Sequence, residues 1–382
     1  MLTAEGSRRR MARFRERLAE RWGAGWDAAV IHRPEHLLYL ANFFPLPNSL
    51  NLRSSSFLLV ERDGPATLFT DNWLAQGNSA AVDEVVVRDW YTCIGPAENR
   101  AIVVGDEVQK KLRSRRVQTL LGELGHLPQH VASAASRLIE VEDVLRGMRE
   151  IKDPDELDAI RRGIRTAEAG HAAARELIRP GMTELELYAG VVARAIVAAG
   201  APFVMMCDLA SGPRAAEGGG APTSRVLEDG ELVIVDLFPY VEGYRGDITN
   251  TLVVGGRPTP EQQALFDLVF EGLAAAEELL RPGTPVSEVY RVIDKVFRDE
   301  SRHARAQGKR SLGHHAGHAI GLGHPEAPEL VPESDRKLEA GMVLTLEPGI
   351  YGAPTGGVRL EHNYLVTETA PERLSRHVLG LV

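Results

Sequence analysis

The pattern of hydrophobic and polar positions in the first part of the chain predicts one amphipathic helix followed by several strands. Met11, Phe14, Leu18 and Trp22 recur at three- and four-residue spacing among arginines and glutamates, which is typical of a helix with one buried face. Short apolar runs, separated by turn residues or helical patterns, predict strands at 28–31, 57–60, 66–69, 84–87 and 101–104. We therefore expect an α/β domain over residues 1–149.

From Lys152 onward the pattern changes to long helical segments, and this part contains an internal repeat. The segment 170–181 reappears, imperfectly, at 272–283. Each copy closes a helix with Arg-Pro-Gly, because proline cannot continue a helix and glycine suits the turn that follows. A second helical pattern comes after each turn, so the repeat predicts a duplicated helical pair in a second domain over residues 150–382.

Each copy of the repeat continues into a buried strand that leads to a carboxylate. Residues 230–236 read G-E-L-V-I-V-D and residues 341–347 read G-M-V-L-T-L-E, so that each apolar run ends in an acid, Asp236 or Glu347. An ionised carboxylate at the end of a buried strand costs free energy unless a positive group meets it. If the two halves pack around a pseudo-twofold axis, Asp236 and Glu347 should converge at the centre.

Three further polar residues follow these strands or lie between them. Asp247 lies in G-Y-R-G-D-I-T, Glu361 ends G-V-R-L-E, and His318 belongs to the glycine-rich run G-H-A-I-G-L-G. Four carboxylates that share one space would force some of them to take up protons, whereas two divalent cations would neutralise them and leave room for a hydroxide. The charge count therefore predicts two metal ions on five side chains: Asp236, Asp247, His318, Glu347 and Glu361.

Each of these residues also has a simpler interpretation. A single acid is more often a solvated or salt-bridged surface carboxylate than a metal ligand. Here the acids occupy matching places in a repeat, and the strands before them are too apolar for an exposed edge. A helical H-x-x-x-H zinc site formed by His314 and His318 is another interpretation, but the flanking Gly313 and Gly317 argue against a helix there.

Composition and charge exclude several other classes of protein. The formal net charge of −9 gives no overall attraction to phosphate backbones, so nucleic acid is not an expected partner. No stretch reaches the roughly 18 to 20 apolar residues that a membrane span needs. Cys93 and Cys207 are far apart in the sequence and form no C-x-x-C pair, which fits the reducing cytoplasm and predicts no disulfide framework.

Four motifs in the second part resemble those of a known family, the pita-bread metallohydrolases, which include methionine aminopeptidase, aminopeptidase P, prolidase and the metal-free creatinase. The motifs are V-D-L-F-P-Y-V-E-G-Y-R-G-D-I-T-N-T, G-H-A-I-G-L-G, T-L-E-P-G-I-Y and G-V-R-L-E. The resemblance extends over nearly the whole chain. It implies an α/β (α+β) protein in which a creatinase/prolidase-like N-terminal domain, 1–149, precedes a pseudo-twofold pita-bread catalytic domain, 150–382.

The resemblance also implies roles for individual residues. Asp236 would bind one metal ion, His318 and Glu347 would bind the other, and Asp247 and Glu361 would bridge the two. Glu347 would also act as general base for the water that bridges the metals. His314 and Arg359 occupy positions at which the family contacts or orients its substrate.

This ligand set predicts a hydrolytic mechanism. Two cations roughly 3.5 to 4 Å apart lower the pKa of a shared water, and the resulting hydroxide would attack a substrate carbonyl. An imidazole such as that of His324 could assist at the oxyanion. The oxygen-rich shell favours manganese, cobalt, iron or zinc in an open site. We expect a peptidase that acts at the N-terminal bond of short peptides and prefers Xaa-Pro, either as a dipeptidase or as an aminopeptidase.

The sequence departs from the family at two positions. Prolidases and aminopeptidases P usually carry a histidine where this chain has Gly219, and His324 is shifted by one residue from a family histidine that would fall on Pro325. Loss of an imidazole near the scissile bond should change which substrate is accepted, because buried donors make such pockets selective. The glycine run 218–220 is compatible with a flexible surface loop and with a specialised substrate loop.

These departures leave other functions open. One is an aminopeptidase without proline specificity, another is a hydrolase or lyase of a small non-peptide metabolite on the same metal site, and a third is a non-catalytic binding module. The resemblance further implies a homodimer. In such a dimer the predicted long loop 42–56 of one chain would narrow the cleft of the other, since loops of that length are more often functional than idle.

Overall fold

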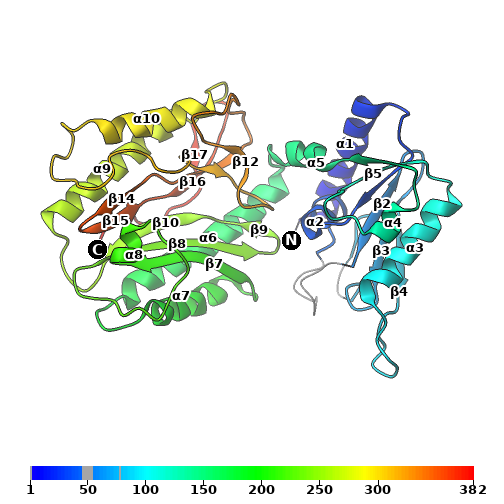
Figure 1. The fold of residues 1–382 in the computed structure, drawn as a ribbon, viewed down its shortest axis with the longest axis horizontal. Coiled ribbons are helices and arrows are strands. Elements are labelled where there is room, and N and C mark those ends of the chain that lie inside the picture. Colours follow the sequence, from blue (N-terminus) through cyan, green and yellow to red (C-terminus); the bar gives the residue numbers. More distant parts are fainter. Residues whose placement is uncertain (1, 45–54, 77–78) are drawn as a thin grey trace. The chain divides into compact units, whose positions relative to one another are not determined.

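The computed structural model describes residues 2–44, 55–76 and 79–382 and divides the chain into two compact units, Met1–Arg149 and Glu150–Val382 (Figure 1). Residues 45–54, the greater part of the loop predicted at 42–56, lie outside the described residues. No helix in the described ranges is both long enough and apolar enough to cross a membrane.

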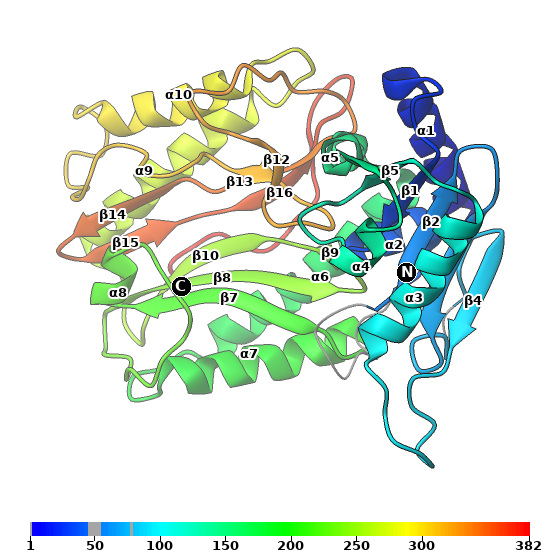
Figure 2. The same ribbon diagram turned by 45° about the vertical axis from the view of Figure 1, so that its right-hand side comes forward.

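The first unit is built on a sheet with the strand order β4-β3-β2-β1-β5-β6. Pairs β1·β2 and β2·β3 are antiparallel, and the other three neighbouring pairs are parallel. Every residue of β1 is buried, so both faces of the sheet are covered; α3 and α4 pack on one face (Figure 2). The elements are α1 (Ala4–Trp22), β1 (Ala28–Ile31), α2 (Pro34–Ala41), β2 (Phe57–Glu61), β3 (Ala66–Asp71), β4 (Glu84–Arg88), α3 (Arg100–Ser114), β5 (Thr119–Gly122), α4 (Gln129–Ala132), β6 (Arg137–Glu140) and α5 (Glu142–Arg149).

One predicted strand of this unit is wrong. Residues 101–104 form the first turn of α3, because the apolar positions continue at helical spacing through Val104, Val108 and Leu112, all fully buried. The side chain of Asn99 accepts a hydrogen bond from the N–H of Ile102 and caps this helix. The predicted first helix and the other four predicted strands are confirmed, whereas β5 and β6 were not predicted.

The second unit contains two sheets and a separate hairpin. One sheet has the order β10-β8-β7 with β9 beside β8, the other has the order β12-β11-β13-β16-β17, and β14 pairs with β15. The elements are α6 (Pro154–Leu177), α7 (Glu184–Ala199), β7 (Val204–Ser211), α8 (Pro213–Ala216), β8 (Leu232–Val241), β9 (Tyr244–Arg245), β10 (Ile248–Val253), α9 (Pro260–Glu277), α10 (Val286–Arg298), β11 (His318–Ala319), β12 (Glu326–Glu329), β13 (Val343–Leu346), β14 (Gly349–Ala353), β15 (Gly356–Arg359), β16 (His362–Leu365) and β17 (Glu372–Arg373).

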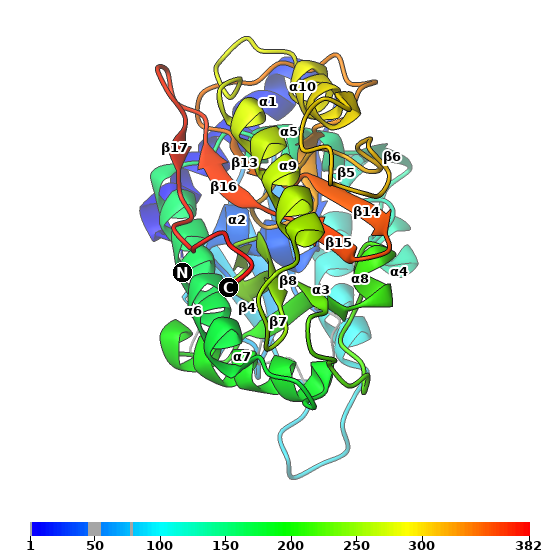
Figure 3. The ribbon, with the colours of Figure 1, turned by 90° about the vertical axis from the view of Figure 1, so that its left-hand side faces the viewer.

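The duplicated helical pair is confirmed as α6–α7 and α9–α10. Figure 3 shows the strands of the unit lying between these two pairs. Gly170 and Gly272 occupy equivalent places in the repeat, and each lets its helix approach a neighbour closely. A Cβ on Gly170 would lie 3.2 Å from Val191 of α7, and one on Gly272 would lie 3.4 Å from Ile293 at the equivalent place in α10. The repeat therefore specifies two similar helix packings on opposite sides of the strands.

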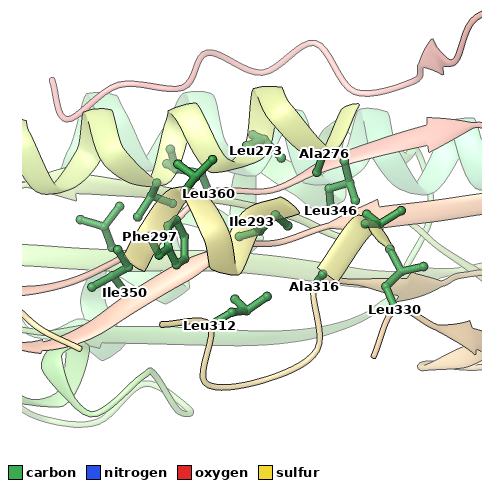
Figure 4. Packing of buried hydrophobic residues seen from close by; sticks show 14 of the residues in the cluster. Leu273, Ala276, Ile293, Phe297, Leu312, Ala316, Leu330, Leu346, Ile350 and Leu360 are labelled. Carbon is green, nitrogen blue, oxygen red and sulfur yellow. The ribbon is translucent and has the colours of Figure 1, made fainter. Parts of the chain in front are cut away.

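The larger core of this unit joins α9 and α10 to the strands of the second half. Figure 4 shows Phe297 and Ile293 of α10 packed with Leu273 of α9 and Leu360, which follows β15. Phe297 is fully buried and belongs to the core that joins the helices to the strands. Its ring therefore helps to hold the pair α9–α10 on the sheet that carries His318.

We predict that Phe297→Ala lowers the free energy of unfolding by about 3 to 5 kcal/mol, because it removes a fully buried ring and leaves a cavity. The matched control is Phe270→Ala on the neighbouring helix α9, whose side chain is 48% exposed and which should cost far less. Urea titration followed by circular dichroism measures the difference. Equal losses in the two variants would contradict the assignment of Phe297 to the core.

Candidate metal centre

The five residues predicted as metal ligands are all buried and come from both sheets of the second unit. Their exposed fractions run from 1% for Glu361 to 8% for Glu347. Asp236 lies in the middle of β8, which continues to Val241, so the expectation that it ends its strand is wrong. The strand is longer because its residues after Asp236 pair with the first half of β7, Val204–Cys207, and with β9. Glu347 does follow β13 directly, as predicted.

Hydrogen bonds between the two halves hold these residues together. The backbone N–H of Glu361 donates to the carbonyl of Thr249 at 3.0 Å, and the hydroxyl of Thr249 donates to Glu361 Oε2 at 2.7 Å. On the other side of the junction, the N–H of Asp247 donates to Asn363 Oδ1 at 3.2 Å. These hydrogen bonds join the segments around β10 to those around β16, and they fix the positions of the acidic side chains relative to one another.

The five side chains form one continuous cluster. Carboxylate oxygens of Asp236, Asp247 and Glu361 lie within 4.8 Å of one another. His318 Nε2 extends the cluster, since it is 3.4 Å from Asp247 Oδ2 and 3.3 Å from Glu347 Oε1. The acids that the repeat places at equivalent positions therefore meet in space, as the pseudo-twofold interpretation requires.

His318 has the tautomer that a metal ligand needs. Its Nδ1 is 2.9 Å from the carbonyl oxygen of Ala319, which can only accept, so Nδ1 carries the proton and donates. The lone pair of Nε2 then faces the carboxylates. Burial also lowers the pKa of His318, which keeps its imidazole neutral. His314, by contrast, lies in a loop, and His318 lies in β11, so a helical H-x-x-x-H zinc site is not formed.

The electrostatics of the cluster fit a bound cation. Burial, and then the charge of Asp247, raises the pKa of Asp236 to about 7 and raises the pKa values of Glu347 and Glu361 well above their ordinary range. Two buried oxygens, Asp236 Oδ1 and Glu361 Oε1, have no hydrogen-bond partner within the described part of the chain. Buried carboxylate oxygens without donors are costly, and divalent ions are the partners that would satisfy them.

Four members of the cluster, all but Glu361, line a pocket of about 800 Å³ that also includes His324, His314 and Arg359. His324 Nε2 is 2.7 Å from Asp247 Oδ2, and the imidazole stacks on Phe238 with ring centroids 4.7 Å apart. Burial alone would lower the pKa of His324, but its hydrogen bond to Asp247 and the charge of that residue raise it. Despite the shift of one residue in the sequence, this imidazole still lines the pocket.

His314 and Arg359 meet at a third pocket residue, Tyr351. Arg359 Nε donates to the Tyr351 hydroxyl at 2.8 Å, and His314 Nε2 lies 3.0 Å from the same oxygen. Burial, and then the nearby Arg359 charge, lowers the pKa of His314 to about 4, so that the ring is neutral at physiological pH. Arg359 Nη1 also donates to Asp236 Oδ2 at 2.7 Å, which links this group to the acidic cluster.

The sequence analysis missed several residues of the site. Tyr351, Thr249 and Thr345 lie inside the quoted motifs, but nothing in their spacing shows that the hydroxyl of Tyr351 meets Arg359 or that the two threonine hydroxyls donate to acids. Thr345 Oγ1 donates to Glu347 Oε1 at 3.3 Å. His315 Nδ1 lies 3.3 Å from the same oxygen. Of these contacts with acids, that of Thr249 with Glu361 depends on the packing of the two halves, whereas Thr345 and Glu347 are close neighbours in the sequence.

Comparison with known proteins agrees with this fold. Residues 158–368 match the model of metallopeptidase family M24, and residues 10–151 match the creatinase/prolidase N-terminal domain. A probable dipeptidase PepE of Mycobacterium tuberculosis is 31% identical over 83% of this chain and 82% of its own length. A Xaa-Pro dipeptidase of Pyrococcus furiosus is 30% identical over 71% of this chain and 77% of its own length.

A solved structure, the prolidase from Pyrococcus horikoshii, has a TM-score of 0.80 and 25% sequence identity, and the match covers 98% of this chain and 100% of that one. These matches define the protein as a metallopeptidase with the pita-bread fold and a creatinase-type N-terminal domain. The chain belongs to metallopeptidase family M24.

We predict that the purified protein binds about two equivalents of divalent ion, and that Asp247→Ala loses most of this metal, because Asp247 lies beside both Asp236 and His318. Metal analysis after dialysis measures the stoichiometry. Glu333→Gln, which removes one exposed acid outside the pocket, serves as the control and should keep the metal. Full metal content in Asp247→Ala would contradict the predicted site.

We also predict that Glu361→Gln stabilises the metal-free protein, and that the gain increases from about pH 5 to about pH 8. The raised pKa of Glu361 means that the folded state keeps a proton that the unfolded chain releases above the ordinary glutamate pKa of about 4.3. The free energy of unfolding of the wild type therefore falls as the pH rises, whereas a glutamine at this position does not titrate and contributes no such loss. Calorimetry of chelator-treated wild type and variant measures the difference in Tm. A gain in Tm that shrinks with rising pH would contradict a raised pKa of Glu361 in the folded protein.

Proposed function

We propose that this protein hydrolyses the N-terminal peptide bond of short peptides with a preference for Xaa-Pro, as a dipeptidase or an aminopeptidase, and that it uses two divalent metal ions. The observation that carries the proposal is the cluster of five buried candidate ligands, four of which line the pocket and two of which have a carboxylate oxygen without a hydrogen-bond partner among the described residues. The names of its relatives, Xaa-Pro dipeptidase and prolidase, support the substrate class.

The proposed ligand set is Asp236 on one ion, His318 and Glu347 on the other, and Asp247 and Glu361 shared by both. Four carboxylates and one imidazole suit manganese, cobalt, iron or zinc. When bound, such ions polarise a carbonyl group and lower the pKa of a water molecule. Two hydrogen bonds orient the proposed ligands. The hydroxyl of Thr249 donates to Glu361, and the carbonyl of Ala319 accepts from His318.

The remaining residues of the proposed mechanism move or place protons and orient the substrate. Glu347, which lines the pocket, would act as the general base that takes the proton of the attacking water and returns it to the leaving amine. His324, whose pKa is raised, would donate to the developing oxyanion. His314 and Arg359, joined through Tyr351, would contact the substrate on the far side of the pocket.

A second candidate function keeps the metal site and changes the substrate. Gly219 lies in the pocket wall, where the family resemblance leads us to expect a histidine. This observation favours a peptidase without proline preference, or a hydrolase or lyase of a small non-peptide metabolite. A non-catalytic binding module is disfavoured by the retention of all five proposed ligands.

A panel of Xaa-Pro and Xaa-Ala peptides of increasing length, with added manganese, cobalt or zinc, separates these functions. We expect release of the N-terminal residue, with Xaa-Pro cleaved faster than Xaa-Ala. Cleavage of both at similar rates would favour the broader aminopeptidase. Release from none of the peptides by the metal-loaded protein would contradict the proposed peptidase activity.

We predict that Glu347→Gln lowers kcat/KM for the preferred peptide by about 10²- to 10⁴-fold, because the amide can no longer accept a proton from the attacking water. His324→Ala should lower kcat by about 10²-fold through loss of a donor at the oxyanion. Circular dichroism and metal analysis show whether each variant keeps its fold and its ions. The exposed acid Glu333 supplies the control variant Glu333→Gln, and a comparable loss there would contradict a specific role for Glu347.

The proposal includes a homodimer that acts in the cytoplasm. Its support is the family resemblance, together with two free cysteines of which Cys93 is exposed, as expected in a reducing compartment. The proposed domains are the N-terminal domain 1–149 and the catalytic domain 150–382. Light scattering of the purified protein tests the dimer directly.

A further inference from the structure

Asp208 lines the pocket but has no part in the proposed metal site. It lies on β7 directly opposite Asp236 of β8, so the two side chains leave the sheet on the same face. The Asp208 side chain is 32% exposed, in contrast to the 7% of Asp236. Its carboxylate is therefore the acid of this pair that a bound substrate can reach.

The Asp208 carboxylate occupies the space beside Gly219. A Cβ built on Gly219 would lie 2.9 Å from Asp208 Oδ2, and the backbone of Gly219 has a φ of +127°, which side-chain-bearing residues rarely adopt. A histidine at this position would therefore meet both a strained backbone and a filled space. In this chain the pocket presents a carboxylate at the place where the family resemblance leads us to expect an imidazole.

The loop that carries Gly219 is held in this position by hydrogen bonds from three sides. The N–H of Leu209 donates to the carbonyl of Gly220 at 2.9 Å, Arg214 Nη2 donates to the carbonyl of Ala221 at 2.7 Å, and Arg359 Nη2 donates to the carbonyl of Gly218 at 2.6 Å. The glycine run is thus a shaped wall of the pocket, which decides between the two interpretations left open by its composition.

The charges around Asp208 leave room for one more cation. Arg359 Nη1 is shared between the two acids, at 2.7 Å from Asp236 Oδ2 and at 3.3 Å from Asp208 Oδ2, so Asp208 has the longer and weaker contact. Lys309, which lines the pocket together with Arg359 and four histidines, is exposed to solvent. Two divalent ions would offset the four ligand carboxylates, and Arg359 would offset a hydroxide. Asp208 then carries a negative charge that these groups do not balance.

We propose that Asp208 is a specificity-determining residue that binds the ammonium or guanidinium group of a substrate side chain next to the scissile bond. This inference rests on the proposed peptidase function and deepens it. A carboxylate that is partly shielded from solvent forms charge-assisted hydrogen bonds with such a group, and a pocket that satisfies them rejects a neutral isostere. The cation can come from the residue before the bond or from the residue after it.

The test compares arginine with citrulline, which has the same shape but no charge. The metal-loaded protein is given Arg-Ala and citrulline-Ala, and separately Ala-Arg and Ala-citrulline, with Ala-Pro and Ala-Ala as reference peptides. We expect kcat/KM to be about tenfold higher for the arginine member of one pair, and that pair identifies the side of the bond on which the cation lies. In Asp208→Asn the ratio of arginine to citrulline should fall to about one.

Two control variants separate a contact with Asp208 from a general effect of charge. Glu217→Gln removes an exposed acid from another part of the same pocket, and Glu228→Gln removes an exposed acid outside it. Both should keep the wild-type preference for arginine. A ratio that falls equally in Asp208→Asn and Glu217→Gln would overturn the assignment to Asp208.

Binding provides a readout that does not depend on turnover. Calorimetry with argininamide and citrullinamide, on metal-loaded and on chelator-treated protein, should show tighter binding of argininamide to wild type and an equal affinity for the two ligands in Asp208→Asn. In one outcome the protein cleaves the reference peptides and yet shows equal kcat/KM values and equal affinities for the arginine and citrulline ligands. That result would overturn this inference and leave the peptidase function intact. Failure to cleave any peptide would instead overturn the function, and the binding experiment would still test Asp208.

Discussion

The desolvation of acidic side chains at the junction of two sheets is the constraint on which residues 150–382 depend. Asp236, Glu347 and Glu361 are buried among strands that are otherwise apolar, and burial raises the pKa of each. A fold that served stability alone would place apolar residues there, because buried charges rarely repay their loss of hydration. Cations at the junction would offset this cost, so the cost in folding and the proposed capacity to bind metal have one physical origin.

The hydrogen bonds around the acids show how the fold bears this cost. Thr249 joins the backbone and the side chain of Glu361, Asn363 joins Asp247, and Arg359 reaches Asp236 from β15. Each of these contacts crosses between segments that are far apart in the sequence. They orient the carboxylates before any ion binds, and this preorganisation makes a site precise enough for catalysis. The two similar helical pairs on opposite sides then hold the strands at a fixed separation.

The metal centre and the substrate wall are set by different parts of the chain. Two of the proposed ligands, Asp236 and Glu347, belong to the segments that the internal repeat duplicates, whereas the wall around Gly219 belongs to the loop after α8, which lies outside the repeat. A change in that loop can therefore alter which substrate is accepted without moving the acids. Gly219 and Asp208 form one such feature of the wall, because the Asp208 carboxylate fills the space that a side chain at position 219 would need.

The sequence by itself determined the fold class, the duplicated helical pairs and the five candidate ligands, because hydrophobic period, the Arg-Pro-Gly turns and the matched acids are all local patterns that repeat. It misassigned residues 101–104, since a short apolar run fits a strand as well as the start of a helix until Val108 and Leu112 are placed on the same buried face. The sequence also predicted that β8 ends at Asp236. This prediction was wrong because pairing with β7 and β9 extends the strand to Val241. Asp208, Tyr351 and Thr249 became part of the site only in the tertiary structure, because strand register and long-range packing decide which polar side chains face the pocket.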